Sequence, residues 1–351
     1  MKAVNSKNKT RVGIVNVTGY AGVELARLLS RHPSVELVSV SGRSAAGKKL
    51  GEVFPHLAYL DMTITAELAE VDFAFSALPH KESVDVVRAL ISGGVKVVDI
   101  SADFRLKDPA LYQEWYGFSH TASDLLAERV YGLPEIYRKD ITKARLVANP
   151  GCYPTSAILG LAPVMKAGLV GSHIIIDSKS GLSGSGRSLT ISSHYTEANE
   201  DVTAYALEGH RHLPEIEQEV ARFMHGAKPV VTFVPHLVPM TRGILTTIYA
   251  PLSGRLEASK DGIADLKVLF QDFYKDEPFV RISPVPPHSK HTTGSNMCLI
   301  YPTIDIHSGR VIIISVIDNL LKGAAGQAVQ NMNLMLGFPE TTGLEAAPVF
   351  P

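Results

Sequence analysis

A short apolar segment, a glycine-containing turn, a helix and a second apolar segment follow one another near the start of the chain. Residues 11–17 (RVGIVNV) are apolar, the turn over residues 18–22 leads into a helical pattern over 21–30, and residues 35–40 (VELVSV) give a second strand. This order opens a βαβ unit, and similar alternation continues to about residue 148. It predicts a parallel sheet with both faces covered.

The pattern changes after about residue 150. Later β-rich runs, with Ser308–Gly309 as a hairpin turn, predict a mixed, largely antiparallel sheet. A final helix should pack back on the first domain, because its apolar stripe must be buried. We therefore expect an α/β chain with an N-terminal Rossmann-type doubly wound domain and a second, α+β domain. The expected bounds are 1–150 with the helix at about 320–337 for the first domain, 151–319 for the second, and 338–351 for a loose tail.

Composition excludes several classes of protein. Hydrophobic residues make up 45% of the 351 residues, and Lys+Arg 34 against Asp+Glu 35 leaves a formal charge of -1. This composition is typical of a globular protein and offers no basic field for nucleic acid or an anionic membrane. Residues 1–11 lack the apolar core of a secretory signal, and two cysteines cannot form a disulfide framework. We expect a cytoplasmic protein with no nucleic-acid or membrane partner.

The first strand–helix junction carries the pattern of a dinucleotide site. Glycines there let the backbone approach a pyrophosphate, and the helix N-terminus favours negative charge. A purely structural turn is the alternative. The expected cofactor contacts in this turn are Gly13, Thr18, Gly19, Tyr20 and Gly22.

The end of the second strand indicates which cofactor is bound. NAD sites usually carry an acid there, whereas this chain has Ser41, Arg43 and Ser44 and no acid between Val38 and Gly51. A cation with hydroxyl groups suits a 2′-phosphate, so we expect NADP(H). The alternative is that Arg43 is only a solvated loop residue.

A cysteine follows a strand and begins a helix in residues 149–155 (NPGCYPT). The helix dipole and its free N–H groups stabilise a thiolate at such a position, so we predict that Cys152 is a nucleophile. The alternative is a buried structural cysteine. Cys298 lies in a strand pattern and is expected in the core.

A thiol nucleophile needs an acid/base partner, and residues 209–215 (GHRHLPE) offer two histidines. In an extended chain His210 and His212 project to one side, and Glu215 is spaced to orient a ring or to contact substrate. We favour His212 as the acid/base. The alternatives are ordinary helix-start polarity or a metal site with Cys152, which no metal-ligand spacing supports.

Two further segments carry candidate anion-binding groups. Residues 180–187 (SGLSGSGR) form a Gly/Ser loop in which Ser183 and Gly184 can donate to phosphate and which ends at Arg187. Arg105 follows the strand over residues 95–100, at the sheet edge where doubly wound folds bind ligands. Both arginines are candidate substrate-binding residues.

A dinucleotide domain followed by a cysteine nucleophile and a histidine implies chemistry between acyl and aldehyde levels. The sequence resembles the N-acetyl-γ-glutamyl-phosphate reductases of arginine biosynthesis, relatives of the aspartate-semialdehyde dehydrogenases, from about residue 12 to 337. The resemblance rests on the Gly13–Gly22 turn and on ALPH (77–80), DISADFR (99–105), YGLPE (131–135), NPGCYPT (149–155), SGLSGSGR (180–187), HRHLPE (210–215) and NLLKGAAGQAVQNMN (319–333).

The resemblance implies NADPH-dependent reduction of a small acyl-phosphate substrate, N-acetyl-L-glutamyl 5-phosphate, through a cysteine thioester. It places Cys152 on the nucleophile, His210 and His212 on the active-site pair, and Asn319 near the nicotinamide. It also implies a homodimer or homotetramer formed through the second domain. Asn16 departs from the small residue that the family usually has in its turn. We expect that cofactor binding survives.

Two other functions remain open at the level of sequence. The first is the same chemistry on the aminoadipyl phosphate of lysine biosynthesis, because one methylene changes discrimination by only ~1–3 kcal/mol. The second is a non-catalytic nucleotide-sensing module, which would not need Cys152 and its histidine partner.

Overall fold

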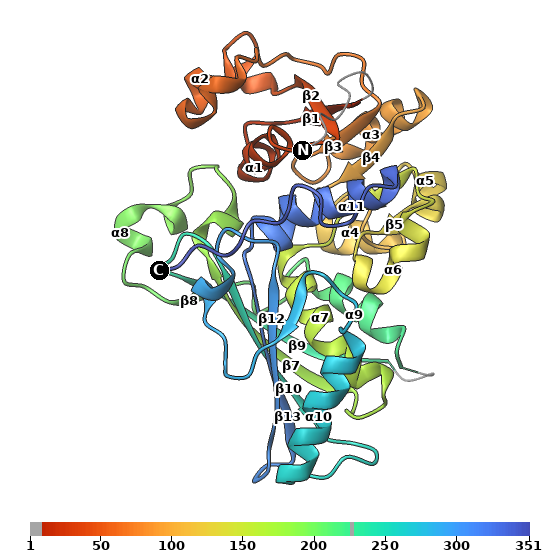
Figure 1. Ribbon diagram of the computed structural model, residues 1–351, viewed down its shortest axis with the longest axis vertical. Helices are drawn as coiled ribbons and strands as arrows, with labels where there is room; N and C mark the ends of the chain where they lie inside the picture. The colour runs from red at the N-terminus through yellow and green to blue at the C-terminus, as the bar shows by residue number, and fades with distance from the viewer. Residues whose placement is uncertain (1–8, 225–227) are drawn as a thin grey trace, which may run out of the picture. The chain divides into compact units, whose positions relative to one another are not determined.

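The computed structural model describes residues 9–224 and 228–351. The chain forms two compact units. The first runs to Pro150 and also contains Ala325–Glu345, and the second contains Gly151–Ala324 and Ala346–Pro351. Figure 1 labels most of their helices and strands.

The first unit is built on a parallel six-stranded sheet with the order β2-β1-β3-β4-β6-β5. Its strands are β1 (Thr10–Val15), β2 (Val35–Val40), β3 (Phe73–Ser76), β4 (Lys96–Asp99), β5 (Val130–Tyr131) and β6 (Leu146–Ala148). Its helices are α1 (Tyr20–Leu29), α2 (Leu50–Val53), α3 (Ser83–Ser92), α4 (Ala110–Tyr116), α5 (Ser123–Glu128), α6 (Pro134–Ile141) and α11 (Gly326–Leu336). The parallel sheet expected from the alternating pattern is confirmed.

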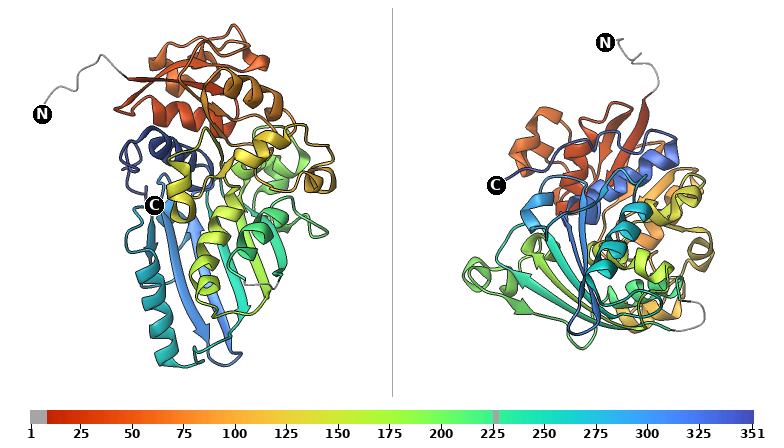
Figure 2. Two further views of the ribbon diagram at one scale, coloured as in Figure 1. Left: turned by 90° about the vertical axis from the view of Figure 1, so that its right-hand side faces the viewer. Right: turned by 60° about the horizontal axis from the view of Figure 1, so that its bottom comes forward.

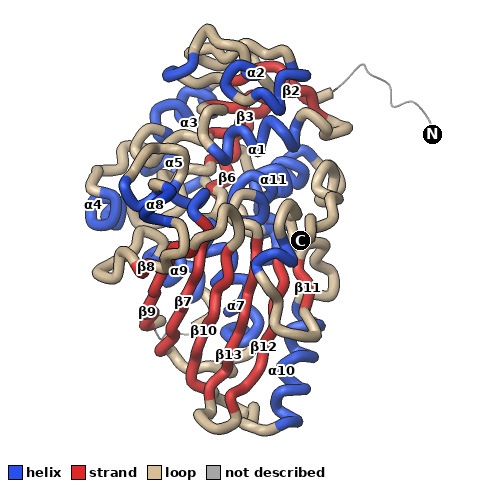
Figure 3. The backbone as a smooth tube through the Cα atoms, turned by 90° about the vertical axis from the view of Figure 1, so that its left-hand side faces the viewer, coloured by secondary structure: helices blue, strands red, loops and turns tan. Residues whose placement is uncertain are grey.

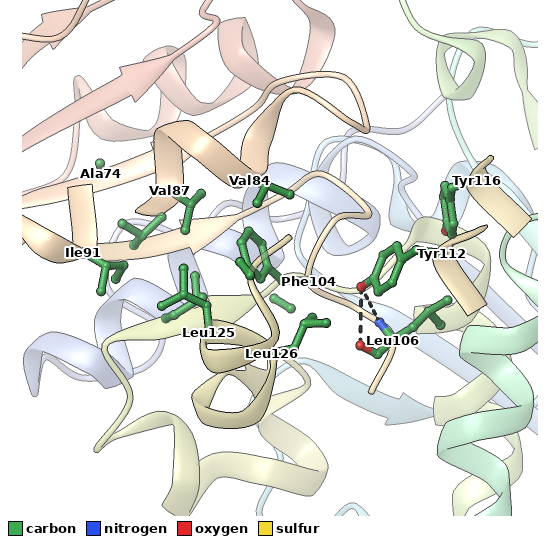
Figure 4. Packing of buried hydrophobic residues seen from close by; sticks show 14 of the residues in the cluster. Ala74, Val84, Val87, Ile91, Phe104, Leu106, Tyr112, Tyr116, Leu125 and Leu126 are labelled. Atoms are coloured by element: carbon green, nitrogen blue, oxygen red, sulfur yellow. Dashed lines mark hydrogen bonds between the residues drawn. The ribbon is translucent and has the colours of Figure 1, made fainter. Parts of the chain in front are cut away.

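Strands β3 and β6 are buried at every position, which is the mark of a sheet covered on both faces. One core cluster packs α3, α4 and α5 against this sheet around Phe104 and Tyr112, both fully buried (Figure 4). The Tyr112 hydroxyl accepts the Leu106 N–H at 2.9 Å. This packing fixes the loop that follows β4, which contains Arg105.

Helix α11 belongs to the first unit although it follows the whole second unit in the sequence. It contacts α1 and α6, as expected for a terminal helix that must bury its apolar side. Its polar side chains are also used, because Gln327 and Asn331 both donate to the carbonyl of Gly132 at 3.0 and 2.9 Å. A side chain at Gly132 would lie 2.4 Å from the Asn331 amide, so only glycine fits there.

The expectation of a loose tail over 338–351 is wrong for residues 338–344, whereas residues 345–351 are exposed and lie outside helices and strands. The Glu340 carboxylate accepts from Arg138 Nε at 2.9 Å, and Leu344 is only 4% exposed. Within the second unit, the Val349 N–H donates to the Thr293 carbonyl at 2.8 Å. Contacts made far away in the sequence hold this segment, and local composition carries no sign of them.

The second unit contains a mixed seven-stranded sheet with the order β11-β12-β13-β10-β7-β9-β8. Its strands are β7 (His173–Gly181), β8 (Thr203–Ala204), β9 (Val230–Val238), β10 (Ile244–Pro251), β11 (Val280–Ile282), β12 (Cys298–Asp305) and β13 (Arg310–Ile317). Its helices are α7 (Cys152–Lys166), α8 (Tyr195–Ala198), α9 (Leu213–Ala221) and α10 (Lys260–Phe273). The antiparallel β12–β13 hairpin confirms the turn predicted at Ser308–Gly309.

Helices α7 and α10 lie along one face of this sheet (Figure 2). Residues of β10 alternate between buried and half-buried, with Ile244, Thr246 and Ile248 buried against that face. Figure 3 looks onto the opposite face, where the strands lie open to the viewer over most of their length. None of the helices in the described ranges is both long and apolar enough to cross a membrane.

Candidate active site

Cys152 is the first residue of α7, so the helix start predicted at the cysteine is confirmed. It is half-buried and forms no disulfide. The preceding Gly151 donates its N–H to Glu215 Oε1 at 2.8 Å, and the Thr155 hydroxyl donates to the Gly151 carbonyl at 2.9 Å. These hydrogen bonds fix the turn that holds the cysteine at the helix N-terminus, where a thiolate is favoured.

A π-helical segment, Leu321–Ala325, packs directly against the cysteine. A side chain added at Gly323 would place its Cβ 2.8 Å from Cys152 Cβ. The Gly323 N–H donates to the Asp318 carbonyl at 3.0 Å. Single π turns occur frequently at functional sites. The role of Gly323 is not visible in the sequence, because a glycine in a helical pattern carries no sign of what it will contact.

The two histidines lie next to each other and against the residue that follows the cysteine. The ring centroids of His210 and His212 are 4.8 Å apart. The ring centroid of Tyr153 lies 5.6 Å from that of His210 and 5.9 Å from that of His212. His210 also packs on Tyr205 and Phe233. The structure therefore brings both histidines against Tyr153, the residue next to Cys152 in the sequence, within one unit.

Burial distinguishes the two rings. Burial, and then the charge of Arg211, lowers the pKa of His210 to about 4, so this ring is neutral at pH 7. Its Nδ1 accepts the backbone N–H of His212 at 3.0 Å, which places the ring proton on Nε2. A ring so enclosed is suited to support its neighbour, which favours His212 for proton transfer.

Two tyrosine hydroxyl groups lie beside this cluster. The Tyr205 hydroxyl donates to the Tyr153 hydroxyl at 3.1 Å. Burial raises the pKa of Tyr205 to about 12, and the charge of Cys152 adds to that rise. The thiol therefore lies in a region where the tyrosines stay protonated and neutral.

Asp318 and Asn319, which follow β13, connect the loops of the second unit. The buried Asp318 carboxylate accepts from the Gly294 N–H at 2.8 Å and lies 3.5 Å from Arg242 Nη1. Asn319 accepts from the Gly243 N–H at 2.8 Å and donates to the Ser183 hydroxyl at 2.9 Å. Sequence analysis missed Asp318 and Arg242, which only the folded arrangement of loops brings together.

The predicted cofactor contacts Ser183, Gly184 and Asn319 do lie together. A Cβ at Gly184 would lie 3.7 Å from Asn319 Nδ2. Both polar atoms of the Asn319 amide are engaged with Gly243 and Ser183. The amide thus shapes this loop, and direct contact with a cofactor stays a prediction.

The predicted substrate contacts differ in exposure. Arg187 is exposed, whereas Glu215 is fully buried and holds Gly151. In the first unit, Arg105 is 7% exposed and donates from Nε to the Asn149 carbonyl at 2.9 Å. Glu215 is thereby favoured as a positioning residue for the cysteine turn.

The first unit contains a cavity of about 490 Å³ between the ends of β1, β2 and β3 and helix α3. Three of the predicted cofactor residues, Ser41, Arg43 and Ser44, line it. Asn16 also lines it, with a left-handed backbone (φ 63°) that asparagine tolerates better than most residues. Its amide donates to the Ala77 carbonyl at 2.8 Å and accepts from the Thr18 hydroxyl at 3.1 Å.

The glycines of this turn have different roles. A Cβ at Gly22 would lie 2.4 Å from the Asn16 carbonyl oxygen, so glycine allows α1 to approach the turn. A Cβ at Gly19 would make only an ordinary contact, 3.8 Å from Asn16 Nδ2, while Tyr20 begins α1 and is 36% exposed. The placement of Gly13 at the junction is wrong: it lies inside β1, where Leu68 fills the space a side chain would take.

Comparison with known proteins follows this division of the chain. The family model described as semialdehyde dehydrogenase, NAD binding domain, matches residues 11–144, and the one described as semialdehyde dehydrogenase, dimerisation domain, matches residues 152–319. An N-acetyl-gamma-glutamyl-phosphate reductase of Dehalococcoides mccartyi (strain CBDB1) is 60% identical, covering 98% of this chain and 99% of its own. The chain belongs to the N-acetyl-gamma-glutamyl-phosphate reductases of the semialdehyde dehydrogenase family.

Other members and solved structures agree with this family assignment. The enzyme of the same name from Pelotomaculum thermopropionicum is 50% identical, covering 97% of this chain and 99% of its own. Aspartate semialdehyde dehydrogenase II of Vibrio cholerae has a TM-score of 0.69 at 15% identity, covering 94% of this chain and 99% of that chain. A Candida albicans aspartate semialdehyde dehydrogenase with NADP has a TM-score of 0.68 at 15% identity, with the same coverage. These structures share the fold.

Proposed function

We propose that this chain reduces N-acetyl-L-glutamyl 5-phosphate with NADPH, giving N-acetyl-L-glutamate 5-semialdehyde, phosphate and NADP+, a step of L-arginine biosynthesis. The observation that carries the chemistry is Cys152 at the start of α7, followed by Tyr153, whose ring packs against the paired rings of His210 and His212. A partly exposed cysteine at a helix N-terminus with an adjacent acid/base is the arrangement that acyl transfer to sulfur requires.

Cys152 acts as the nucleophile. His212 takes the thiol proton, and Sγ attacks the acyl carbon of the substrate. The carbon–oxygen bond to phosphate breaks, so that phosphate leaves and an acyl thioester remains on Cys152. The hydrogen bond from the Gly151 N–H to Glu215 Oε1 holds the turn during this step.

The thioester is then reduced to the aldehyde. NADPH, when bound, supplies the hydride for this reduction. The reduced thioester is a thiohemiacetal oxyanion, which collapses as the carbon–sulfur bond breaks and releases the aldehyde. His212 then returns its proton to the Cys152 sulfur, which restores the thiol. His210, neutral and enclosed by aromatic rings, keeps His212 in place through its bond to the His212 N–H.

The residues of the first unit fit a dinucleotide with a 2′-phosphate. Arg43 supplies a cation and Ser41 and Ser44 supply hydroxyl groups to one cavity. Gly19 is the N-cap of α1 and has no side chain, which suits a pyrophosphate at this helix N-terminus. Asn16 does not close the turn, because its amide is bound to Ala77 and Thr18. Arg105 and Arg187 are our candidates for the anionic groups of the substrate.

The second unit supports self-association. A dimerisation-domain model matches it, and the face of its sheet opposite α7 and α10 presents half-buried residues such as Leu245, Thr247 and Tyr249. We propose that a second copy of the chain covers this face, in a homodimer or homotetramer. Cys152 and Cys298 form no disulfide, in keeping with work in the reducing cytoplasm.

The test runs the reaction backwards, because acyl phosphates hydrolyse readily. Enzyme, N-acetylglutamate semialdehyde and NADP+ are mixed with and without phosphate, and NADPH absorbance is followed. Phosphate-dependent NADPH formation that Cys152→Ser abolishes, while NADPH binding persists, is the expected result. A larger signal with the aminoadipate homologue would move the chain to the lysine route. No signal with either aldehyde would refute the proposed reaction.

A further inference from the structure

The nucleotide cavity of the first unit is lined mostly by acidic groups among its charged residues. Of the lining residues in the described ranges, Arg43 is the one cation, while Glu67, Glu82 and Asp85 carry carboxylates. A cavity that takes a 2′-phosphate would be expected to carry an excess of positive charge instead. The acidic lining therefore bears on how strongly this site prefers NADP(H) to NAD(H).

Glu67 differs from the other two acids because it is paired with the cation. Its Oε1 lies 3.7 Å from Arg43 Nη2, and the two side chains are 80% and 76% exposed. The position of Glu67 is set by the backbone of its loop, which is hydrogen-bonded to the end of β2. The Gly42 N–H donates to the Thr65 carbonyl at 2.9 Å, and the Thr65 N–H donates to the Val40 carbonyl at 3.0 Å.

This placement adds to the cavity an acid that the segment after β2 lacks. NAD sites use an acid at the end of the second strand to bind the ribose 2′-hydroxyl. The segment after β2 has no acid, but Glu67, in the loop that precedes β3, lines the same cavity and lies beside Arg43. The cavity thus holds the group typical of each specificity, an arginine for a 2′-phosphate and a carboxylate for a 2′-hydroxyl.

We propose that Glu67 sets the cofactor preference of this site by competing with the 2′-phosphate of NADP(H) for Arg43. When a 2′-phosphate binds, Arg43 must leave Glu67, and the carboxylate that remains repels the phosphate. When NAD(H) binds, the pair stays together and the carboxylate accepts from the 2′-hydroxyl. Glu67 therefore lowers the discrimination that Arg43, Ser41 and Ser44 would give alone. This inference rests on the proposed use of NADPH.

The experiment compares two ligands that differ only in the 2′-phosphate, namely 2′,5′-ADP and 5′-AMP. Their dissociation constants are measured by calorimetry with the full chain at low ionic strength, for the wild type and Glu67→Gln. We expect Glu67→Gln to raise the affinity for 2′,5′-ADP about three- to fivefold, the size of an exposed charge pair, with 5′-AMP unchanged or weaker. The gain should shrink at 0.5 M salt, because added ions screen exposed charges.

Asp85→Asn is the matched control, because Asp85 lines the same cavity from α3 and is also exposed. We expect it to change the ratio of the two affinities less than Glu67→Gln does. An unchanged ratio in Glu67→Gln, or an equal change in Asp85→Asn, overturns the inference. NADPH and NADH fluorescence titrations repeat the comparison with whole cofactors.

Failure of this inference is distinguishable from failure of the proposed function. If the wild type forms NADPH in the reverse assay and Glu67→Gln leaves the ratio unchanged, only the role of Glu67 is refuted. If the wild type binds neither 2′,5′-ADP nor NADPH, the cavity is not the cofactor site, and both proposals are overturned.

Discussion

The contact between Gly323 and the active-site cysteine gives a sharp test of the site geometry. In Gly323→Ala the new methyl carbon would lie 2.8 Å from Cys152 Cβ and 3.3 Å from Cys152 Cα. Carbon atoms in favourable contact lie about 3.5–4.0 Å apart, so the cysteine or the π-helical segment must move by roughly 0.7 Å. The atom nearest to the new methyl carbon is the Cβ of Cys152, the predicted nucleophile.

The expected result is a large loss of rate with a small loss of stability. A misplacement of about 1 Å at a reacting group can lower the rate ~100-fold, so we expect kcat to fall about 10- to 100-fold. Overpacking costs about 1–3 kcal/mol, but alanine favours helix over glycine by about 1 kcal/mol and offsets part of this cost. NADPH binding, which we assign to the first unit, should not change.

Two assays separate displacement of the thiol from general damage. The reverse reaction gives kcat, and alkylation by iodoacetamide reports the reactivity of Cys152, since Cys298 is fully buried. Gly171→Ala is the matched control, because its methyl carbon would meet only Pro251, at an ordinary 3.8 Å. Full activity and unchanged alkylation in Gly323→Ala would show that the packing against the cysteine does not control its position.

Glu215→Ala removes the acceptor of the Gly151 N–H, so urea unfolding should show a loss of about 1–3 kcal/mol, whereas Glu215→Gln should keep most of the stability. Burial, and then the charge of Asp99, raises the pKa of Asp103 to about 6. The Asp103 carboxyl therefore binds its proton more tightly in the folded state than in the unfolded state. The stability that this tighter binding adds is complete below about pH 4 and is lost as the pH rises through 6. When the pH falls from 7 to 5, the wild type should therefore gain roughly 1 kcal/mol of unfolding free energy from Asp103, and Asp103→Asn should lack this gain. The same pH dependence of stability in both proteins would contradict this. His212→Asn should lower kcat about 10²- to 10⁴-fold with NADPH binding intact, and a loss below tenfold would exclude it as the acid/base.

Local patterns predicted the parts of this fold that depend on neighbouring residues. The alternation of strands and helices, the hairpin at Ser308–Gly309 and the burial of Cys298 all follow from periodicity or turn chemistry. Cys152 was placed at a helix start by its flanking glycine and proline. Ser41 and Arg43 were placed at the cavity because the end of a second strand is a fixed position in doubly wound sheets.

The features that the sequence did not reveal are contacts between distant segments. Glu67 reaches Arg43 only because the loop before β3 pairs with the end of β2. Gly323 matters through its distance to Cys152, and Gly13 through the packing of Leu68. Residues 338–345 looked like a tail because no local pattern reports the ion pair from Arg138 to Glu340.

Helix α11 has a consequence for the order in which the protein is made. The strands of the first unit leave the ribosome early, but α11, whose amides bind the Gly132 carbonyl, leaves after roughly 170 residues of the second unit. At typical translation speeds of 5–20 residues per second the interval is about 10 to 35 s. During this time the nascent nucleotide domain lacks its last helix and exposes the groups that α11 will cover. Most of the second unit is thus synthesised between the two segments of the first. The first unit can be completed only after nearly the whole chain has been made.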